Sequence, residues 1–312
     1  MTRCTMKTIL PVCLALICTS YMHSALATEN GSPTTPMGTY EFGSGFLPPA
    51  TPGGTFGLRT AWYSTHDQRT DNGSRSPNDF SLDVLSIGLA YIRMTDQTLF
   101  GARYGFGGVM PFFDMEANLD VNVGGRQVFH DDAHVLAQAD AQIMPLMLAW
   151  QPAANLGISA QFQIQVPTGE YDQDRLINPG LNHWTFSPIV GLTYITEGGL
   201  ELSTLSQIDV NTRNTDTDYR SGVEYRNEFA IGQHLDNWTL GLGGYYYDQL
   251  SDDKSPSLSA GDGRRARVWA AGPAVSFFSP GLPAVWFHVY KEFGAENRTQ
   301  GYNAAVRLAY SF

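Results

Sequence analysis

Hydrophobic and polar residues alternate along most of the chain with a period of two. In residues 155–168, every second position from 156 to 166 is apolar, and the positions between them include Ser159 and three glutamines. Residues 221–234 and 300–312 show the same alternation. A period of two is typical of β-strands with one apolar face. Runs of about ten residues exceed an ordinary strand and match a tilted strand that crosses a bilayer.

Turn-forming residues divide this pattern into about twelve predicted strands. We expect them at residues 54–66, 80–94, 98–112, 140–151, 155–168, 183–196, 199–212, 221–234, 237–251, 264–279, 283–296 and 300–312. Short connections alternate with long ones, which are expected at 67–79, 113–139, 169–182, 213–220 and 252–263. Outer-membrane barrels have short periplasmic turns and long extracellular loops. The sequence therefore predicts an all-β fold, a transmembrane antiparallel up-and-down β-barrel. A soluble β-sandwich, the alternative, would have shorter strands.

The first 27 residues have the features of a secretory signal peptide. Arg3 and Lys7 form a basic start, residues 9–17 form an apolar core, and Ala25-Leu26-Ala27 is a small-x-small cleavage pattern. We expect export and cleavage after Ala27. An uncleaved membrane anchor is the alternative, although its core is short for a bilayer. Residues 28–53, rich in Pro and Gly, are predicted to form an extended tail or a plug segment, and residues 54–312 to form the barrel.

Composition supports an exported barrel and excludes several classes of protein. Without Arg3 and Lys7, the 19 basic residues fall to 17 against 30 acidic residues, so the net charge of the mature chain is −13. Nucleic acid is excluded as a partner because its phosphates bind basic surfaces. All three cysteines, Cys4, Cys13 and Cys18, lie in the predicted leader. A closed ladder of backbone hydrogen bonds, rather than disulfides, is expected to hold the fold together.

Aromatic residues indicate the bacterial outer membrane as the location. The chain ends with Phe312, preceded at two-residue steps by Tyr310 and Leu308, which resembles the C-terminal signature of outer-membrane proteins. We expect the barrel-assembly machinery to recognise Phe312. Tryptophans near both kinds of connection suit two interfacial girdles in contact with outer-membrane lipid and lipopolysaccharide. They are Trp150 and Trp238 at short turns, and Trp62 and Trp184 near long loops.

Five segments in the second half of the chain carry a more specific pattern. They are 182–186 (NHWTF), 218–224 (DYRSGVE), 241–250 (GLGGYYYDQL), 261–264 (GDGR) and 291–298 (KEFGAENR). Together they resemble the outer-membrane family of meta-pathway phenol-degradation proteins and transporters. One departure follows Glu224, where Tyr225-Arg226 stands in place of an aromatic residue followed by His. The resemblance implies a channel for the uptake of aromatic or other hydrophobic compounds.

The histidines form no recognisable catalytic constellation. Six follow the leader: His66, His130, His134, His183, His234 and His288. None lies in the His-x-Ser-Asn-Gly context that outer-membrane phospholipases use. The His130-Asp131-Asp132-Ala133-His134 cluster has residue types that zinc favours, but its position in the longest predicted loop favours a solvated loop. We therefore predict a protein that is not an enzyme and has no metal and no cofactor.

Charged residues on the polar faces of the predicted strands are the better candidates for a functional site. They are Arg59, Arg103, Glu201, Asp209, Glu224, Arg226, Glu228, His288 and Arg307. Two interpretations are open: cross-lumen ion pairs that stiffen or plug the barrel, and a constriction that selects solutes by charge and size. The sequence favours a passive channel for a small hydrophobic or aromatic solute. A non-conducting structural or surface-binding barrel is the alternative.

Overall fold

A computed structural model describes residues 28–31, 33–34, 36–256, 258 and 265–312 of the chain. The predicted signal peptide, residues 1–27, lies outside these described residues. The described residues form thirteen strands and one 3-10 turn, η1 (Glu29–Gly31). The strands are β1 (Thr55–Thr65), β2 (Asp79–Leu99), β3 (Ala102–Val123), β4 (Arg126–Gln138), β5 (Ala141–Ala153), β6 (Leu156–Val166), β7 (Thr185–Ile195), β8 (Leu200–Asn211), β9 (Glu224–Leu235), β10 (Trp238–Gln249), β11 (Arg267–Phe277), β12 (Ala284–Glu296) and β13 (Tyr302–Ser311). No helix in the described part of the chain is long and apolar enough to cross a membrane.

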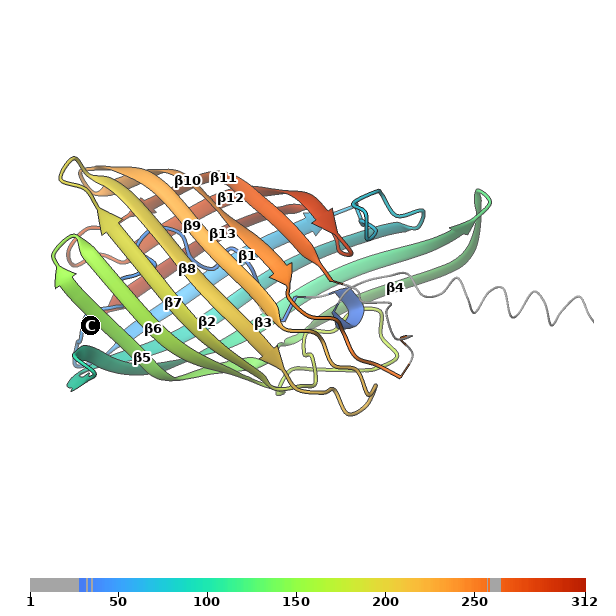
Figure 1. Cartoon of the computed structure of the whole chain (residues 1–312), viewed down its shortest axis with the longest axis horizontal. Coiled ribbons are helices and arrows are strands. Elements are labelled where there is room, and N and C mark those ends of the chain that lie inside the picture. Colours follow the sequence, from blue (N-terminus) through green and yellow to red (C-terminus); the bar gives the residue numbers. More distant parts are fainter. Residues whose placement is uncertain (1–27, 32, 35, 257, 259–264) are drawn as a thin grey trace, which may run out of the picture.

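Twelve of the strands form a closed antiparallel barrel, and β4 is an additional strand (Figure 1). Each barrel strand pairs with its neighbours along the chain, except that β3 pairs with both β4 and β5. The ring closes where β1 pairs with β13, from Thr55 opposite Ser311 to Ser64 opposite Tyr302. A closed ring has no unpaired strand edge. The predicted up-and-down β-barrel is confirmed.

Over most of the ring, the strands bury their polar faces and expose their apolar faces. In β6, for example, Ser159 and Gln161 are buried, while the alternating apolar positions are partly exposed. Large apolar side chains cover the outside of the barrel, such as Phe56 (58% exposed), Val190 (55%) and Leu242 (60%). This arrangement is the inverse of a soluble protein. It suits a barrel whose outer surface contacts lipid and whose interior is polar.

The sheet of β2, β3 and β4 extends beyond the ring at the end that carries the long connections, termed the long-loop end (Figure 1). The predicted loop at 113–139 is wrong: β3 continues to Val123 and β4 returns from Arg126. Gly124 and Gly125 make the turn, both with positive φ (60° and 78°), as a type I′ hairpin requires. The charged residues here alternate with apolar ones, so the stretch continues the strand pattern instead of forming a solvated loop.

A second boundary also differs from the prediction. The short turn expected at residues 95–97 lies inside β2, and the chain instead reverses at Phe100 and Gly101. Both residues have positive φ (53° and 75°), which a tight two-residue hairpin needs. Gly101 supplies that conformation without a Cβ clash. The polar triplet at 95–97 therefore marks the end of the apolar band and not the end of the strand.

The described residues between 28 and 53 lie inside the barrel (Figure 1). At the opposite, short-turn end, the Gly53 N–H donates to the carbonyl of Phe312 (2.8 Å). At the long-loop end, the Thr28 N–H donates to Asp253 (2.8 Å) in the loop after β10. The segment therefore passes along the lumen from one end to the other before β1 begins. Residues 28–53 are termed the plug below.

Candidate functional site

Buried glutamates on β8 and β9 bind the backbone of the plug. Glu228 Oε2 accepts hydrogen bonds from the N–H groups of Thr39 (2.8 Å) and Tyr40. Glu201 Oε1 accepts one from the N–H of Gly43 (2.7 Å). Both carboxylates are at most 3% exposed. A buried carboxylate is costly unless it is hydrogen-bonded, so these acids and the plug satisfy each other.

Cationic side chains bind plug carbonyls in the same way. Arg59 donates to the carbonyl of Gly38 (2.8 Å), and Arg226 donates to that of Pro36 (2.8 Å). Glu224, beside Arg226 on β9, accepts hydrogen bonds from the backbone N–H (3.1 Å) and the hydroxyl of Thr34. The charged lumen residues thus hold the plug mainly through its main chain.

Glu41 is the plug residue that makes side-chain ion pairs with the barrel. Its carboxylate accepts hydrogen bonds from His288 on β12 and from Arg307 on β13 (3.0 Å). Sequence reasoning did not select Glu41, which lies outside the alternating strands. The signal was available, because Glu41 is the one charged residue between Glu29 and Arg59.

The structure gathers seven of the nine predicted lumen residues around the plug: Arg59, Glu201, Glu224, Arg226, Glu228, His288 and Arg307. The other two lie elsewhere. Asp209 accepts hydrogen bonds from Ser187 and Gln207 on the barrel wall. Arg103 lies near the short-turn end, in register with Thr98 and Ala149.

Sequence reasoning also missed a buried ion pair between Glu292 on β12 and Arg298 in the connection from β12 to β13. Glu292 accepts hydrogen bonds from Arg298 (3.2 Å), Tyr245 (2.8 Å) and Tyr63 (2.9 Å). Both charged groups are almost fully buried. They lie within segment 291–298, one of the segments that carried the family resemblance, so this segment held a usable signal.

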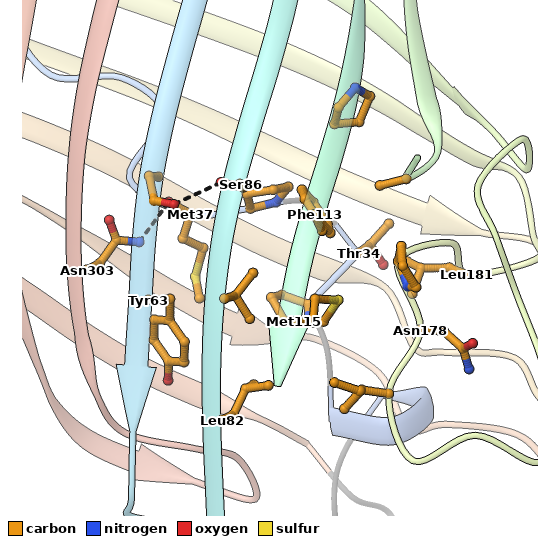
Figure 2. A pocket seen from close by; sticks show the side chains of 18 of the residues that line it. Thr34, Met37, Tyr63, Leu82, Ser86, Phe113, Met115, Asn178, Leu181 and Asn303 are labelled. Carbon is orange, nitrogen blue, oxygen red and sulfur yellow. Dashed lines mark hydrogen bonds between the residues drawn. The ribbon is translucent and has the colours of Figure 1, made fainter. Parts of the chain in front are cut away.

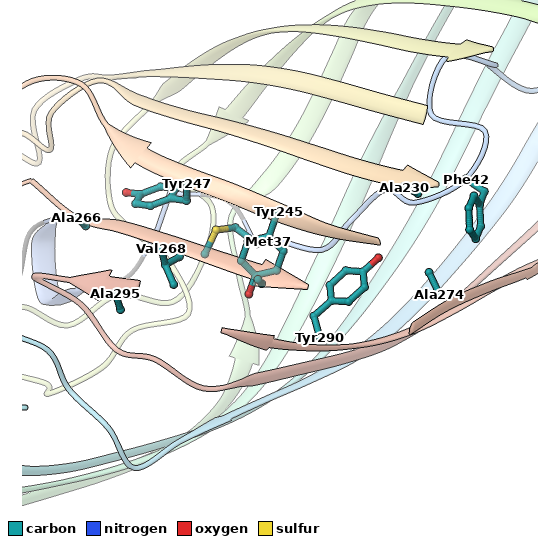
Figure 3. Packing of buried hydrophobic residues seen from close by; sticks show 11 residues of the cluster. Met37, Phe42, Ala230, Tyr245, Tyr247, Ala266, Val268, Ala274, Tyr290 and Ala295 are labelled. Atoms are coloured by element: carbon teal, nitrogen blue, oxygen red, sulfur yellow. The ribbon is translucent and has the colours of Figure 1, made fainter. Parts of the chain in front are cut away.

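Apolar plug side chains pack against the inner faces of β9–β12 (Figure 3). Met37 and Phe42 belong to a buried cluster with three tyrosines and several alanines of β9–β12. The ring of Phe42 lies over Gly232, where a Cβ would be 2.5 Å from the ring. The plug therefore needs glycine at this position of the wall. Apolar packing and backbone hydrogen bonds fix the plug together.

Beside the plug, in the half of the lumen nearest the long-loop end, is a cavity of about 160 Å³ (Figure 2). This pocket is lined on one side by the inner faces of β2 and β3, with Leu82, Phe113 and Met115, and by Leu181 of the loop after β6. On the other side are the plug, with Met37, and polar groups of the barrel. The pocket is thus an apolar recess with a few polar groups at its margin.

The apolar side of the pocket results from a reversal of polarity along β2. In the ring, outward residues such as Leu85 and Leu89 are apolar and exposed. Toward the long-loop end of β2, Asp79 and Asp83 occupy the outward positions, and Phe80 and Leu82 face inward. β3 changes in the same way. The inward residues of β2 from 80 to 84 and of β3 from 113 to 119 are termed the apolar wall, and the inner faces of β6–β9 are termed the polar wall. The buried polar groups of the polar wall include Gln161, Gln163, Gln165, Gln207, Asn211, Glu224 and Glu228.

The loop between β6 and β7 covers the apolar wall and is tied down by Asp140. The two carboxylate oxygens of Asp140 accept hydrogen bonds from the N–H groups of Gly169 and Leu181, each 2.8 Å long. Burial raises the pKa of Asp140, and these hydrogen bonds oppose the shift. The loop thereby places Ile177 against Phe80 and Met115.

The His–Asp cluster lies on β4 in the extension, not in a loop. His130 pairs with Asp120 (2.7 Å) and His134 with Asp114 (2.8 Å), all on the exposed outer face. The hydrogen bond from Asp120 raises the pKa of His130. Within the described residues, no group of three or more His, Cys, Asp or Glu side chains is arranged to hold a metal ion.

A closed twelve-stranded ring with an apolar outside and a polar interior defines the class of outer-membrane-type β-barrels. Within this class, the chain belongs to the family described as "Putative MetA-pathway of phenol degradation", whose model matches residues 65–308. The family resemblance seen in the sequence is confirmed.

Solved structures share the fold at low sequence identity. An outer membrane channel from Pseudomonas putida F1 superposes with a TM-score of 0.70 at 17% identity, covering 86% of this chain and 98% of that one. The transport unit of the autotransporter AIDA-I from Escherichia coli gives a TM-score of 0.52 at 9% identity, covering 96% and 98%. No curated protein sequence matches this chain.

Proposed function

We propose that this protein is a passive channel of the bacterial outer membrane that admits small hydrophobic or aromatic molecules. The observation that carries the proposal is the pocket between the apolar wall and the plug. In outer-membrane barrels the long loops face the exterior, so the pocket would be the first site that an incoming solute meets. The family description, which refers to phenol degradation, supports an aromatic solute, and the outer membrane channel from Pseudomonas putida supports a channel role.

The size and lining of the pocket suit one small ring. A dry cavity of about 150 Å³ lined by apolar side chains binds benzene, and the pocket here has about 160 Å³. Phe113, Met115 and Leu82 would supply apolar contacts. Polar groups at the margin, including Asn178 and Asn303, would form a hydrogen bond with one hydroxyl group of the solute. Phenol-like solutes therefore fit better than sugars or ions.

Passage to the periplasm requires the plug to move aside. The plug fills the lumen below the pocket, and its main-chain hydrogen bonds to Glu201 and Glu228 are repeated along its length. Such contacts can be exchanged for water one at a time. The plug would thus act as a local gate that shifts over a short distance and does not leave the barrel.

The test is solute binding by the purified, folded protein. We expect Phe113→Ser to weaken the binding of phenol or toluene about tenfold, since burying an aromatic side chain contributes about 1.5–3 kcal/mol. Asp114→Ser is the matched control, because Asp114 is the next residue on β3 and pairs with His134 on the outer face. Equal loss of binding in both variants, or in neither, would show that the pocket is not the solute site.

The filled lumen favours a second candidate, a barrel that conducts nothing and acts in surface binding or as a structural element. Planar-bilayer recordings separate the two functions. Absence of any conductance, together with unchanged solute uptake in a deletion strain, would support the non-conducting barrel. Solute-dependent growth that requires the gene would support the channel.

A further inference from the structure

The carboxylate of Asp253 is buried at the long-loop end. Its hydrogen-bond partners among the described residues are all uncharged groups. Oδ1 accepts from the N–H of Gly222 (2.8 Å) and from Gln249 (2.6 Å). Oδ2 accepts from the hydroxyl of Tyr219 (2.6 Å) and from the backbone nitrogen of Thr28 (2.8 Å). The side chain is 7% exposed. No Lys, Arg or His among the described residues forms an ion pair with it. A buried anion without a countercharge is unfavourable.

The partner on Oδ2 is the first residue of the predicted mature chain. Thr28 is 3% exposed and has a φ of 65°. A β-branched residue rarely takes a positive φ, because its side chain and the preceding carbonyl crowd each other. Removal of that carbonyl by cleavage after Ala27 would relieve the crowding. It would also turn the Thr28 nitrogen from an amide into a charged amine, which is protonated at neutral pH.

We propose that Asp253 is the binding site for the α-ammonium group that signal-peptide cleavage creates at Thr28. Hydrolysis of the Ala27–Thr28 peptide bond consumes one water, leaving a carboxylate on the departing leader and an ammonium group on Thr28. That ammonium group supplies the countercharge of Asp253. A charge-assisted hydrogen bond is shorter and stronger than the amide contact that it replaces. Capture of a chain terminus by a small set of fixed donors and acceptors is a known mode of peptide recognition.

The residue after Thr28 is held by a matching set of neutral groups. The Glu29 carboxylate accepts hydrogen bonds from Thr217 (2.5 Å) and Asn214 (3.0 Å). The backbone N–H of Glu29 donates to the hydroxyl of Ser221 (3.4 Å). The loop after β10 thus contacts Thr28, and the loop after β8 contacts Glu29. Because Gly31, Thr34 and Met37 line the solute pocket, fixing the start of the plug also fixes one side of that pocket.

The first experiment identifies the mature terminus and measures its reactivity. Intact mass of protein extracted from outer membranes is expected to give a chain that begins at Thr28. The purified barrel is then treated with acetic anhydride, and acetylation of the Thr28 amine is followed by peptide mass spectrometry. Lys254 and Lys291, the two lysines after the leader, serve as internal references. In Asp253→Asn, we expect the amine to react about tenfold or more faster than in wild type, as loss of a charged hydrogen bond implies.

Asp252→Asn is the matched control. Asp252 is adjacent in sequence but is exposed and pairs with Arg265, so its loss should leave the labelling rate of Thr28 unchanged. Heat-modifiable migration on gels shows that each compared sample is folded. If Asp253→Asn does not fold, a refolded chain beginning at Ala27 replaces it. That chain keeps Asp253 but moves the ammonium group by one residue, and its new terminal amine should react at the rate of an exposed amine.

Two results would overturn the proposal. One is a mature chain that begins at a residue other than Thr28. The other is a Thr28 amine that reacts as fast in folded wild type as in Asp253→Asn, or as fast as the terminal amine of the chain beginning at Ala27. Neither measurement depends on whether the barrel conducts or which solute it admits.

Discussion

Two sides of the same lumen differ in what they bind. On the polar wall, the inward residues of β6–β9 are amides, hydroxyls and carboxylates, and Glu201 and Glu228 hold the plug by its backbone. On the apolar wall, the inward residues of β2 and β3 are Phe, Leu and Met, and an open pocket remains beside them. Both sides follow one two-residue alternation. The inner face is therefore the complement of the outer face: apolar outward residues such as Leu85 and Leu89 leave polar inward residues, and the outward residues Asp79 and Asp83 leave apolar ones.

The largest effect is expected from a charge placed on the lipid-facing surface of the ring. Leu89→Arg on β2 and Val190→Arg on β7 should each cost about 2–4 kcal/mol near the membrane midplane and sharply reduce folded yield on heat-modifiability gels. Arg307→Leu, an inward substitution, should assemble better than both. Normal yield of either arginine variant would show that the outward face of that strand is misassigned.

A smaller loss is expected when the polar wall releases the plug. Glu228→Ala removes the acceptor of two plug N–H groups, and hydrogen bonds to charged groups contribute about 1.5–3 kcal/mol each. The barrel should still fold, and its single-channel recordings should become noisier with larger mean conductance. Glu116→Ala, on the exposed extension, is the control and should behave like wild type. If the Glu228→Ala barrel shows no conductance, the obstruction of the lumen does not depend on the contact between Glu228 and the plug.

A substitution on the apolar wall should produce the opposite pattern. Leu82→Ser removes apolar surface from the pocket and should weaken solute binding up to about tenfold, while ionic conductance stays at the wild-type level. Isothermal titration and bilayer recording on the same preparation compare the two effects. If Leu82→Ser alters conductance as strongly as Glu228→Ala does, the two walls do not have separate roles.

The smallest effect is expected at Arg226. One of its contacts is the hydrogen bond to the Pro36 carbonyl, and the neighbouring acids on β9 are also bound by plug N–H groups. Arg226→Ala should therefore leave folded yield unchanged and make the lumen more cation-preferring. Reversal potentials in a salt gradient measure this preference. An identical reversal potential in two conducting proteins would leave Arg226 as a support of the plug alone.

The sequence predicted the ring well because membrane strands repeat one simple rule for their whole length. It failed at residues 113–139, where the polarity of the alternation reverses and charged residues looked like a loop. It identified seven of the residues around the plug because an inward position follows from strand parity. Glu41 and Asp253 were not predicted as site residues because both lie outside strands, where no periodicity indicates which way a side chain faces. The partners of Glu41, which are His288 and Arg307, and the backbone partner of Asp253, which is Thr28, lie far away in sequence.

The course of the plug also constrains how the molecule is made. The segment is continuous with β1 and reaches the far end of a cylinder whose last seam joins β1 to β13. Once that seam is complete, the segment could enter only by threading end first through a narrow polar bore. We therefore expect the later strands to wrap around it, with its contacts to β8 and β9 in place before the seam forms. The beginning of the chain would then serve as a template for ring closure, and variants that weaken its grip would slow folding before they alter the finished barrel.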